Sequence, residues 1–584
     1  MPKKNNKTKF TKVVLPSKNL NTARVLNWYK PVAKYFDKPQ ARPWQKEIIG
    51  IVKDGIEDRG FKYIFLQLPT GDGKSVDAVT VGEYLRQEKK RSYYLLSMDL
   101  GLTAQYRRDY PFLKEVKGRN NFMCNRYPGM TADKAPCVFR GANSCPMYDE
   151  CAYIRQREAA VMSYSTLSTP YYIDRCTPGE IFSKRFLAIR DEAHKLEKFY
   201  MGMFDVRITD GMWNHLNPYQ SFPLYDDIDF WVNEVDDMHG RLDSEVEDAF
   251  QENDIKTLER IVPWFQRLED LKVLFKAPGN VVVDVDKTPE QQRLYATFRP
   301  VTVDKIARKH IDKVADHTIF MSATFLDVKE RCSHLGLNID DVLYVNKIES
   351  NFPKKNRHII YNPVGSMSWK HRDKTMPKML DAILGIIKER NNVVGRLAPR
   401  GLIICASHVI RKQVADYLKI KYEHELIITH TGESGSFNTA FERFLDRPTS
   451  PLIFVTTRYE GLDFHGKLAE YMIYVNLPYM PPMDKQVKAR MKLDQVNFLA
   501  TADGCGYTPN EHDDQCAKSA YCNGCKRWYN LYVAEAIQQA VGRIIRTPED
   551  VGYIYILDSR FKRFFNDNND MFLKYNRDAI EGLL

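Results

Sequence analysis

The stretch Leu68-Pro69-Thr70-Gly71-Asp72-Gly73-Lys74-Ser75 constrains the fold more than any other part of this sequence. It follows an apolar run at 63–67 that we expect to be a buried strand, and it precedes a segment at 76–84 that we expect to be a helix. A glycine-rich turn in that position points backbone N–H groups at a bound phosphate. Lys74 would reach the outer phosphates, and Ser75 would offer its hydroxyl to Mg²⁺. Because the complete pattern begins with glycine and this stretch begins with leucine, a glycine-rich turn beside a surface lysine is the competing interpretation.

Two acidic residues, Asp191 and Glu192, follow a second strand-like run at 186–190. After a phosphate-binding loop, such a pair predicts one carboxylate that helps to hold Mg²⁺ and one that takes a proton from an attacking water molecule. We assign the first role to Asp191 and the second to Glu192. An Asp-Glu pair is common at strand ends, and its position downstream of the loop is what favours catalysis.

Near the end of the chain, Gln539, Arg543 and Arg546 are spaced as i, i+4 and i+7. On a helix these three side chains would share one face. Two guanidinium groups directed at one point can neutralise the charge of a phosphoryl group during its transfer. The alternative is a salt-bridged surface helix, which the small and apolar residues between them argue against.

A further candidate lies upstream of the loop, in Ala41-Arg42-Pro43-Trp44-Gln45. The amide of Gln45 can both donate a hydrogen bond to an adenine and accept one from it. Arg42 stands close by and joins it as a candidate for nucleotide binding. Taken alone, Gln45 is more simply interpreted as an ordinary surface glutamine.

Strand-like and helix-like segments alternate in both halves of the chain, which predicts parallel α/β sheets. A long segment from 199 to about 309 interrupts this alternation with a mostly helical pattern, and we expect its helix to break at Pro263. The remaining strand-like runs lie at 93–98, 401–407, 451–457, 471–478 and 553–558.

The cysteines gather in two groups. The first group can enclose one metal centre; its gaps of twelve, seven and five residues suit an iron–sulfur cluster at least as well as zinc, and reduced structural cysteines are the alternative. The second group ends in a tight Cys-x-x-Cys pair of the kind zinc favours, with His512 as a spare ligand. The first group is Cys124, Cys137, Cys145 and Cys151, and the second is Cys505, Cys516, Cys522 and Cys525.

The charge balance favours a polyanionic partner. The 584 residues carry a net charge of +11 although the segment 226–259 is densely acidic, so the rest of the chain is more basic than the total suggests. The first seven residues are basic with no apolar core after them, so we expect a flexible tail and no secretory signal. No run of about 18 apolar residues occurs, and no membrane span is predicted.

With Asp191-Glu192-Ala193-His194 in place, the sequence resembles the superfamily-two helicases, and among them the iron–sulfur DinG/XPD branch. The likeness extends to the segment before the first cysteine, to a strand that re-enters the first domain, to a coupling motif, to a junction between domains and to a Glu-Gly-x-Asp turn. These parts are residues 117–124, Phe298-Arg299-Pro300, Ser322-Ala323-Thr324, Ser350-Asn351-Phe352-Pro353, and Glu460, Gly461 and Asp463.

The resemblance implies an α/β fold of two RecA-like motor domains, with an iron–sulfur domain and a helical arch inserted in the first. The expected boundaries are a basic flexible tail at 1–20, the first motor domain at 21–110, 160–197 and 310–345, the iron–sulfur domain at 111–159, the arch at 198–309, and the second motor domain at 346–584 with a cysteine-bearing insertion at 481–527.

The resemblance also implies an ATP hydrolase that uses Mg²⁺ and a [4Fe-4S] cluster, and zinc is a further candidate cofactor at the second cysteine group. Glu460, Gly461 and Asp463 would couple the nucleotide state to the nucleic-acid strand. The implied partners are single-stranded DNA and tailed or forked duplexes, with travel from 5′ to 3′, and RNA–DNA hybrids also fit. We expect a monomeric protein of the cytoplasm or nucleoid that binds no membrane; the sequence leaves its protein partners open.

Three hypotheses follow. The first is a DNA helicase, and the second is a nucleic-acid-stimulated ATPase that translocates or remodels within a larger complex without free unwinding. Both require Lys74 and Glu192. The third is a non-catalytic, metal-stabilised nucleic-acid-binding protein, which the intact acidic and arginine positions argue against.

Overall fold

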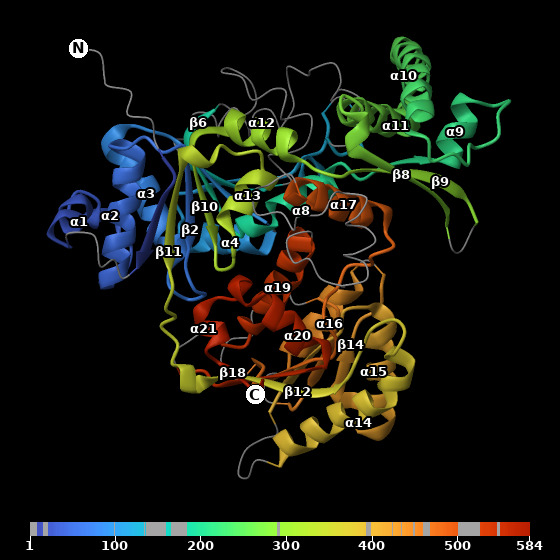
Figure 1. Cartoon of the computed structure of the whole chain (residues 1–584). Coiled ribbons are helices and arrows are strands. Elements are labelled where there is room, and N and C mark those ends of the chain that lie inside the picture. The colour runs from blue at the N-terminus through green and yellow to red at the C-terminus, as the bar shows by residue number, and fades with distance from the viewer. Residues whose placement is uncertain are drawn as a thin grey trace.

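The structure is a computed structural model of the chain. It describes residues 9–15, 22–98, 100–125, 127–132, 135, 159–164, 184–288, 292–392, 399–422, 424–433, 435–447, 450–458, 468–499, 526–545 and 549–583. Figure 1 shows three bodies: a first α/β domain mainly in blue to cyan with some yellow-green elements, a second in yellow to red below it, and a green extension to one side. None of the helices in the described ranges has the length and apolar composition needed to cross a bilayer.

The first domain contains an eight-stranded parallel sheet in the order β1-β11-β2-β10-β6-β3-β5-β4. Its central strands are buried along their whole length, as expected for parallel strands covered by helices on both faces. The helices α2, α3 and α4 cover one face, and α8, α12 and α13 cover the other. The strands are β1 (Thr11–Leu15), β2 (Tyr63–Gln67), β3 (Tyr93–Ser97), β4 (Lys114–Val116), β5 (Ala159–Ser163), β6 (Arg185–Arg190), β10 (Ala315–Ser322) and β11 (Val342–Lys347), and the helices are α1 (Thr22–Tyr29), α2 (Pro43–Glu57), α3 (Lys74–Lys89), α4 (Leu100–Asp109), α8 (Leu196–Met203), α12 (Asp304–Val314) and α13 (Val328–His334).

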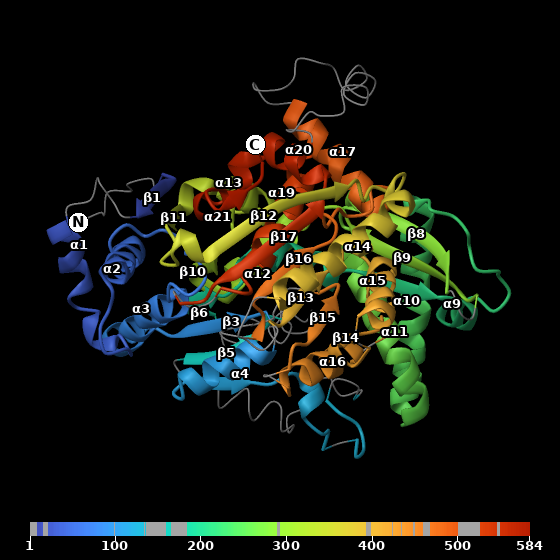
Figure 2. The ribbon, with the colours of Figure 1, turned by 90° about the horizontal axis from the view of Figure 1, so that it is seen from below.

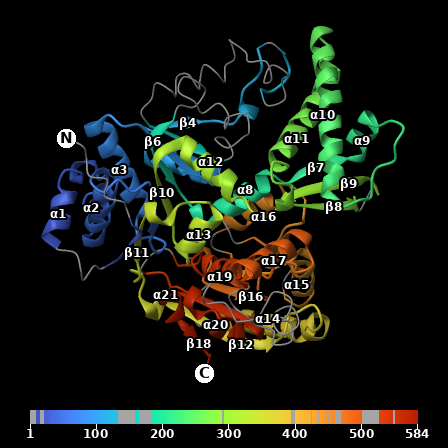
Figure 3. The same cartoon turned by 45° about the horizontal axis from the view of Figure 1, so that its top comes forward.

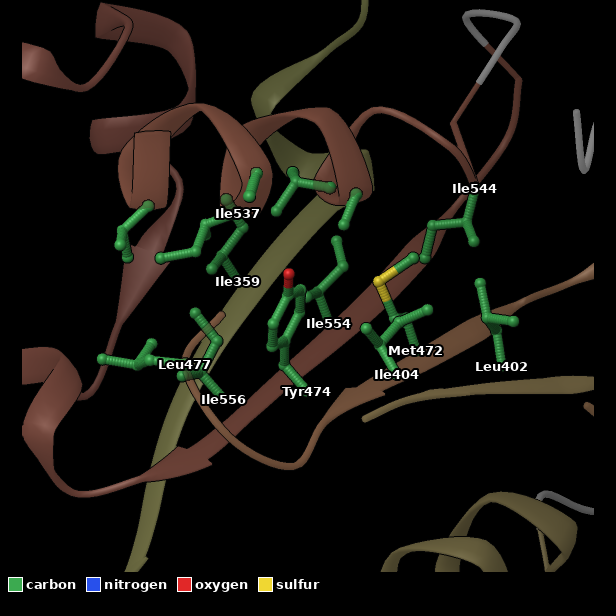
Figure 4. Packing of buried hydrophobic residues seen from close by; sticks show 14 of the residues in the cluster. Ile359, Leu402, Ile404, Met472, Tyr474, Leu477, Ile537, Ile544, Ile554 and Ile556 are labelled. Carbon is green, nitrogen blue, oxygen red and sulfur yellow. The ribbon is translucent and has the colours of Figure 1, made fainter. Parts of the chain in front are cut away.

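The second domain contains a seven-stranded parallel sheet in the order β14-β15-β13-β16-β17-β12-β18 (Figure 2). The helices α16, α19 and α20 cover one face, and α14 and α15 cover the other. Figure 4 shows the first of these layers, where Ile537 of α19 and Ile544 lie over strand residues such as Ile554 and Met472. The strands are β12 (Arg357–Gly365), β13 (Gly401–Ile404), β14 (Ile427–Thr429), β15 (Ile453–Thr456), β16 (Tyr471–Tyr474), β17 (Gly552–Asp558) and β18 (Ile580–Glu581), and the helices are α14 (Arg372–Asn391), α15 (His408–Lys421), α16 (Ser436–Leu445), α17 (Lys485–Leu499), α19 (Arg527–Val541), α20 (Arg560–Asp567) and α21 (Lys574–Arg577).

The green extension is inserted between β6 and β10 of the first sheet (Figure 3). Its helices α10 and α11 extend outward, whereas its strands contact the start of α17 in the second domain. The extension combines a long helical hairpin with a three-stranded antiparallel sheet, β7-β9-β8, around its own apolar core. We call this body the arch. Its elements are β7 (Val206–Thr209), α9 (Asp210–Leu216), α10 (Ile228–Gln251), α11 (Ile255–Leu274), β8 (Val281–Lys287) and β9 (Leu294–Pro300).

The helical hairpin differs from expectation at Pro263, where no break occurs. The chain turns earlier, at Asn253, whose φ is +57°. Pro263 lies inside α11, and apolar residues on both sides of it, such as Leu258 and Leu268, are fully buried. Packing against α10 therefore outweighs the cost of about 3 kcal/mol that proline imposes on a helix interior.

Several expected boundaries also differ. Residues 198–203 were expected in the arch but belong to α8, which packs on the first sheet, and residues 346–347 were expected in the second domain but end β11. Thr11–Leu15, expected as part of a flexible tail, pairs in register with β11 and forms the edge of the first sheet. Lys114–Val116, expected in the iron–sulfur domain, pairs with β5 at the opposite edge. Residues 301–309 were expected in the arch, but α12 packs on the first sheet. Phe298-Arg299-Pro300 is a strand, as expected, but it pairs within the arch sheet rather than in the motor sheet.

Candidate active site

The phosphate-binding loop begins where β2 ends. Gly71 and Gly73 have φ values of +83° and +89°, which glycine adopts without strain. Gly73 is the N-cap of α3, and a Cβ atom at this position would lie 2.7 Å from Nε2 of Gln45. Glycine is therefore required here both by conformation and by space, and the helix N-terminus is left open to an anion.

Gln45 is not a surface residue, because only 5% of it is exposed. Its Nε2 donates to Oδ1 of Asp77 at 2.9 Å, and its Oε1 accepts from the backbone N–H of Arg42 at 3.1 Å. The Arg42 guanidinium lies 5.4 Å from the ring of Trp44. The Nε2 end of the amide thus joins α2 to α3 beside the loop, and the Oε1 end caps the start of α2.

Asp191 and Glu192 directly follow β6, which is separated from β2 in the sheet by the single strand β10. Lys74 Nζ lies 3.7 Å from Oδ1 of Asp191 and 3.7 Å from Oε1 of Glu192. Glu192 has a φ of +49°, a conformation that costs a non-glycine residue about 1–3 kcal/mol. This turn directs both carboxylates towards the same lysine.

Tyr106 of α4 connects the loop to the acidic pair. Its hydroxyl lies 2.8 Å from Oγ of Ser75 and donates to Oδ2 of Asp191 at 2.6 Å. The oxygens of Ser75 and Asp191 therefore converge on one point, and hard oxygen ligands of this kind suit Mg²⁺. The two residues predicted to hold Mg²⁺ are brought together by the fold.

The two carboxylates have opposite electrostatic environments. Burial raises the pKa of Asp191, although Lys74 opposes the shift. Burial would also raise the pKa of Glu192, but Lys74, His194 and Arg543 outweigh it and hold that pKa well below its usual range. Glu192 is consequently ionised at neutral pH, as a proton acceptor has to be.

A chain of polar contacts runs from Glu192 to the second domain. His194 Nδ1 lies 3.3 Å from Oε2 of Glu192 and 2.9 Å from Oγ of Ser322, at the end of β10. The backbone N–H of Thr324 donates to the same Oγ at 2.9 Å, and Nε2 of Gln539 in α19 donates to Oγ1 of Thr324. A displacement of α19 can therefore reach the acidic pair.

Arg543 also lies beside the acidic pair, but it does not project from the face of a helix. The helix α19 ends at Val541, and Gly542 follows, so Arg543 lies in the turn beyond the helix. Its Nη2 donates to Oε1 of Gln539 at 3.4 Å. The expectation of one helix carrying Gln539, Arg543 and Arg546 on a shared face is wrong, because the helix stops before its second member.

Two cavities meet at these residues. One has a volume of about 470 Å³, within the range typical of ligand pockets. The other lies between the domains, where the first contributes Lys74 and Glu192 and the second contributes Gln539 and Arg543. The larger is lined by Lys38, Thr70, Gly71, Gly73, Lys74, Ser75, Val76, Met98, Gly101, Leu102, Gln105, Tyr106, Asp109, Tyr110, Asp191, Glu192, Lys195 and Arg543.

Sequence reasoning missed Tyr106 and Arg357. Arg357 begins β12 and lines the cavity between the domains, where its guanidinium donates to the backbone oxygen of Tyr575 and to Oγ of Ser350, both at 3.2 Å. Neither residue belongs to a recognisable pattern. Tyr106 is 85 positions from its partner Asp191, so only the folded sheet brings them together.

Several predicted residues lie outside the described part of the chain. Among the described residues, no group of three metal-binding side chains gathers in one place. Cys124 is described and is buried beside Tyr127 and Met130. The predicted residues outside the described ranges are Cys137, Cys145, Cys151, Glu460, Gly461, Asp463, Cys505, His512, Cys516, Cys522, Cys525 and Arg546.

Two family patterns match the chain. The type III restriction enzyme res subunit matches residues 38–215, which contain the phosphate-binding loop and the acidic pair. The helicase C-terminal domain matches residues 392–578, which contain α19 and Arg543. The two matched regions thus contribute the two sides of the cavity between the domains.

The sequence relatives are helicases that the chain matches over short stretches. The mouse regulator of telomere elongation helicase 1 is 26% identical over 184 residues, which are 29% of this chain and 14% of the mouse protein. The Arabidopsis thaliana homologue is 32% identical over 127 residues, 21% of this chain and 11% of that protein. The chain therefore spans only a small part of these relatives.

Solved structures match over nearly the whole chain. An XPD helicase structure has a TM-score of 0.59 at 13% identity and covers 91% of this chain and 99% of its own. The Xpd4 structure from S. tokodaii has a TM-score of 0.54 at 14% identity, with coverage of 90% and 98%. These likenesses confirm the expected fold of two RecA-like parallel-sheet domains.

Proposed function

We propose that this chain, which resembles the DinG/XPD-like branch of the superfamily-two helicases, is an ATP-driven DNA helicase or translocase that moves along single-stranded DNA. The observation that carries this proposal is one cavity lined by Lys74 and Glu192 of the first domain and by Gln539 and Arg543 of the second. A site divided in this way is complete only when the domains close, so that hydrolysis can be coupled to their relative movement.

The residues of the site have distinct roles. Lys74 and the backbone N–H groups of the loop bind the phosphates of ATP. Ser75 and Asp191 supply oxygen ligands for Mg²⁺, which when bound neutralises charge on the phosphates. Glu192 takes a proton from the attacking water, and Arg543 stabilises the charge that develops on the transferred phosphoryl group. Arg546 is proposed to assist Arg543.

The acidity of Glu192 changes when ATP is present. In the structure Lys74 and Arg543 hold its pKa low. Phosphate groups bring negative charge close to the same cations, so that part of their field is no longer directed at Glu192. The carboxylate thereby becomes a stronger base when its substrate is bound.

The finer points of the proposal rest on the resemblance. Travel from 5′ to 3′, an iron–sulfur cluster on Cys124, Cys137, Cys145 and Cys151, and use of forked or tailed duplexes are all properties of that branch. We also propose zinc at the second cysteine group and action as a monomer inside the cell. RNA–DNA hybrids are a second substrate class to be tested.

The decisive experiment is strand displacement on duplexes with single-stranded tails of either polarity, made of DNA or of an RNA–DNA hybrid. We expect ATP-dependent unwinding of the 5′-tailed DNA duplex and none with Lys74→Ala. Lys89→Ala is a matched control, because Lys89 ends the same helix α3 and contacts Glu57 on the surface. ATP hydrolysis stimulated by DNA without displacement would favour a translocase that remodels complexes, and no hydrolysis at all would overturn the proposal.

The iron–sulfur assignment has its own test. Protein purified without oxygen should be brown, and Cys124→Ser should remove the colour while Cys332→Ser, a buried cysteine of α13, should not. Colourless wild-type protein that contains stoichiometric zinc would contradict the assignment.

A further inference from the structure

The phosphate-binding loop contains a buried carboxylate. Asp72 lies between Gly71 and Gly73, and only 1% of it is exposed. Gly71 and Gly73 both line the larger cavity beside the loop, whereas Asp72 lines neither that cavity nor the one between the domains. Its side chain is therefore directed behind the loop. A negative charge so close to the phosphate site repels a nucleotide unless a cation balances it.

Lys347, the last residue of β11, supplies that cation. Its Nζ donates to Oδ2 of Asp72 at 2.6 Å, to the backbone oxygen of Glu349 at 2.6 Å and to Oδ1 of Asn351 at 3.1 Å. An ammonium group has three protons, so all of them are used within this cluster. The ring of Trp44 lies 4.8 Å from Nζ and covers the ammonium with an aromatic face.

Asn351 connects this ion pair to the second domain. Its Nδ2 donates to Oδ1 of Asp72, so that the carboxylate is held on both oxygens. Asn351 lies in the segment that carries the chain from β11 to β12, and the next residue, Phe352, is buried in the core of the second domain. Phe352 and Ser350, on either side of Asn351, also line the cavity between the domains. The loop and the junction are therefore joined through one carboxylate.

We propose that Asp72, Lys347 and Asn351 form a strut beneath the phosphate-binding loop, in which Lys347 cancels the charge of Asp72 so that ATP can bind and Asn351 ties the loop to the junction between the domains. All three are positioning residues, since they act through the loop. The proposal rests on the proposed function, because phosphate groups are the ligand of this loop. The competing interpretation is an ion pair that only stabilises the first domain, in which case nucleotide affinity would not depend on its charge.

The test of the charge balance is a mutant cycle read by titration with a fluorescent ATP analogue. Lys347→Met removes the cation that is paired directly with Asp72 and leaves only the weaker influence of Arg42. We expect nucleotide affinity to fall about tenfold or more. Asp72→Asn should bind more tightly than wild type, because the positive charge of Lys347 beneath the loop is then unopposed. The double variant has neither charge and should return to within about threefold of wild type.

A purely structural pair predicts a different result, in which Lys347→Met melts at a lower temperature but binds nucleotide as the wild type does. That outcome overturns the strut, as does a double variant that binds as weakly as Lys347→Met. Should Lys347→Met not fold, Asp72→Asn alone decides: tighter binding supports the proposal, and unchanged or weaker binding contradicts it. Wild-type protein that binds no ATP would instead refute the proposed function itself.

The link to the junction is tested separately with Asn351→Ala. This change keeps the ion pair, so we expect the Kd for nucleotide to stay within about threefold of wild type while kcat falls about tenfold, because loop and junction no longer move together. Equal changes in Kd and kcat, or no change in either, would remove Asn351 from the strut.

Discussion

Two buried carboxylates five residues apart, Glu192 and Glu197, are both held ionised by cations, but they serve different contacts between the domains. Glu192 faces the cavity that Lys74 and Arg543 also line. Glu197, in α8, also lines a cavity, a separate one, but its carboxylate is enclosed by partners: it accepts from Trp528 Nε1 at 3.1 Å and pairs with His334 at 2.9 Å and Arg490 at 3.3 Å. The shift in Glu197 has the same pattern as that in Glu192, since burial would raise its pKa and the nearby cations lower it to about 2.

The two carboxylates differ in whether a ligand can approach the cations around them. Around Glu197, partners from both domains close on the carboxylate: His334 is in α13 of the first, and Arg490 and Trp528 are in α17 and α19 of the second. Around Glu192, cations from both domains face a space that a ligand can enter. One contact is suited to hold the domains together, and the other is suited to respond to a ligand. The same helix, α19, takes part in both, through Trp528 at its start and Gln539 near its end.

The largest effect is expected for Glu192→Gln, the carboxylate that faces the cavity between the domains. The amide cannot take a proton from water, so kcat for ATP hydrolysis should fall by about 10³- to 10⁴-fold while nucleotide still binds. Steady-state hydrolysis and nucleotide titration measure the two. Glu245→Gln is the control. Glu245 also pairs with a histidine, His215, but both residues belong to the arch and not to the cavity between the domains. Unchanged turnover would assign the base elsewhere.

On the enclosed side, Glu197→Gln should act on stability instead. Its removal leaves His334 and Arg490 buried without their carboxylate, and we expect a loss of about 3–5 kcal/mol in the free energy of unfolding. Glu245→Gln again serves as control, since its half-exposed pair should contribute below about 1 kcal/mol. Thermal unfolding gives the comparison. If the two variants have the same melting temperature, the contacts of Glu197 do not hold the domains together.

A smaller effect is expected for Tyr106→Phe, which removes the hydroxyl shared by Ser75 and Asp191. Loss of one hydrogen bond to a charged group corresponds to about 1.5–3 kcal/mol. We expect a higher Mg²⁺ concentration for half-maximal hydrolysis, because the two predicted ligands are no longer held together. Tyr417→Phe, in which the exposed hydroxyl donates to Asp381, is the matched control. The same Mg²⁺ dependence in both variants would exclude a role for Tyr106.

The smallest effect is a dependence of stability on pH through His334. Burial would lower its pKa, but Glu197 and Glu330 raise it above 6.5. Its contribution is therefore complete below pH 6.5 and is lost as pH rises through the raised pKa, whereas that of Glu197 is complete above pH 4.5 and is lost towards about pH 2. The difference in melting temperature between wild type and His334→Gln should be largest between these limits and shrink at alkaline pH. A constant difference would contradict the pairing.

The sequence predicted those parts of the site that are local. The loop at 68–75 and the pair Asp191-Glu192 each stand at the end of a strand whose apolar run is visible in the sequence, and the fold brings them together as expected. Arg543 was predicted for the right cavity from the wrong geometry, since Gly542 ends the helix before it. The local pattern was sufficient to identify the residue but not to predict its backbone conformation.

The contacts around Glu197 and the strut around Asp72 could not be predicted in this way. Glu197 and Trp528 are 331 positions apart, and Asp72 and Lys347 are 275 apart, so no periodicity or spacing relates them. Their partners are defined only when the order of the strands and the docking of the two sheets are known. Pro263 is the reverse case, where a strong local signal for a break is overruled by packing in the arch.

We propose that the two domains share one catalytic site for ATP. Arg543→Ala tests this proposal, because Arg543 is a cation of the second domain that lines both cavities beside the phosphate-binding loop. Hydrolysis should be measured with and without single-stranded DNA, alongside nucleotide affinity, with Arg563→Ala on the surface of α20 as control. We expect that DNA stimulates hydrolysis by the wild type and that Arg543→Ala binds ATP within a few-fold of wild type but hydrolyses it about 10³-fold more slowly. Full DNA-stimulated turnover by Arg543→Ala would contradict a site shared between the domains.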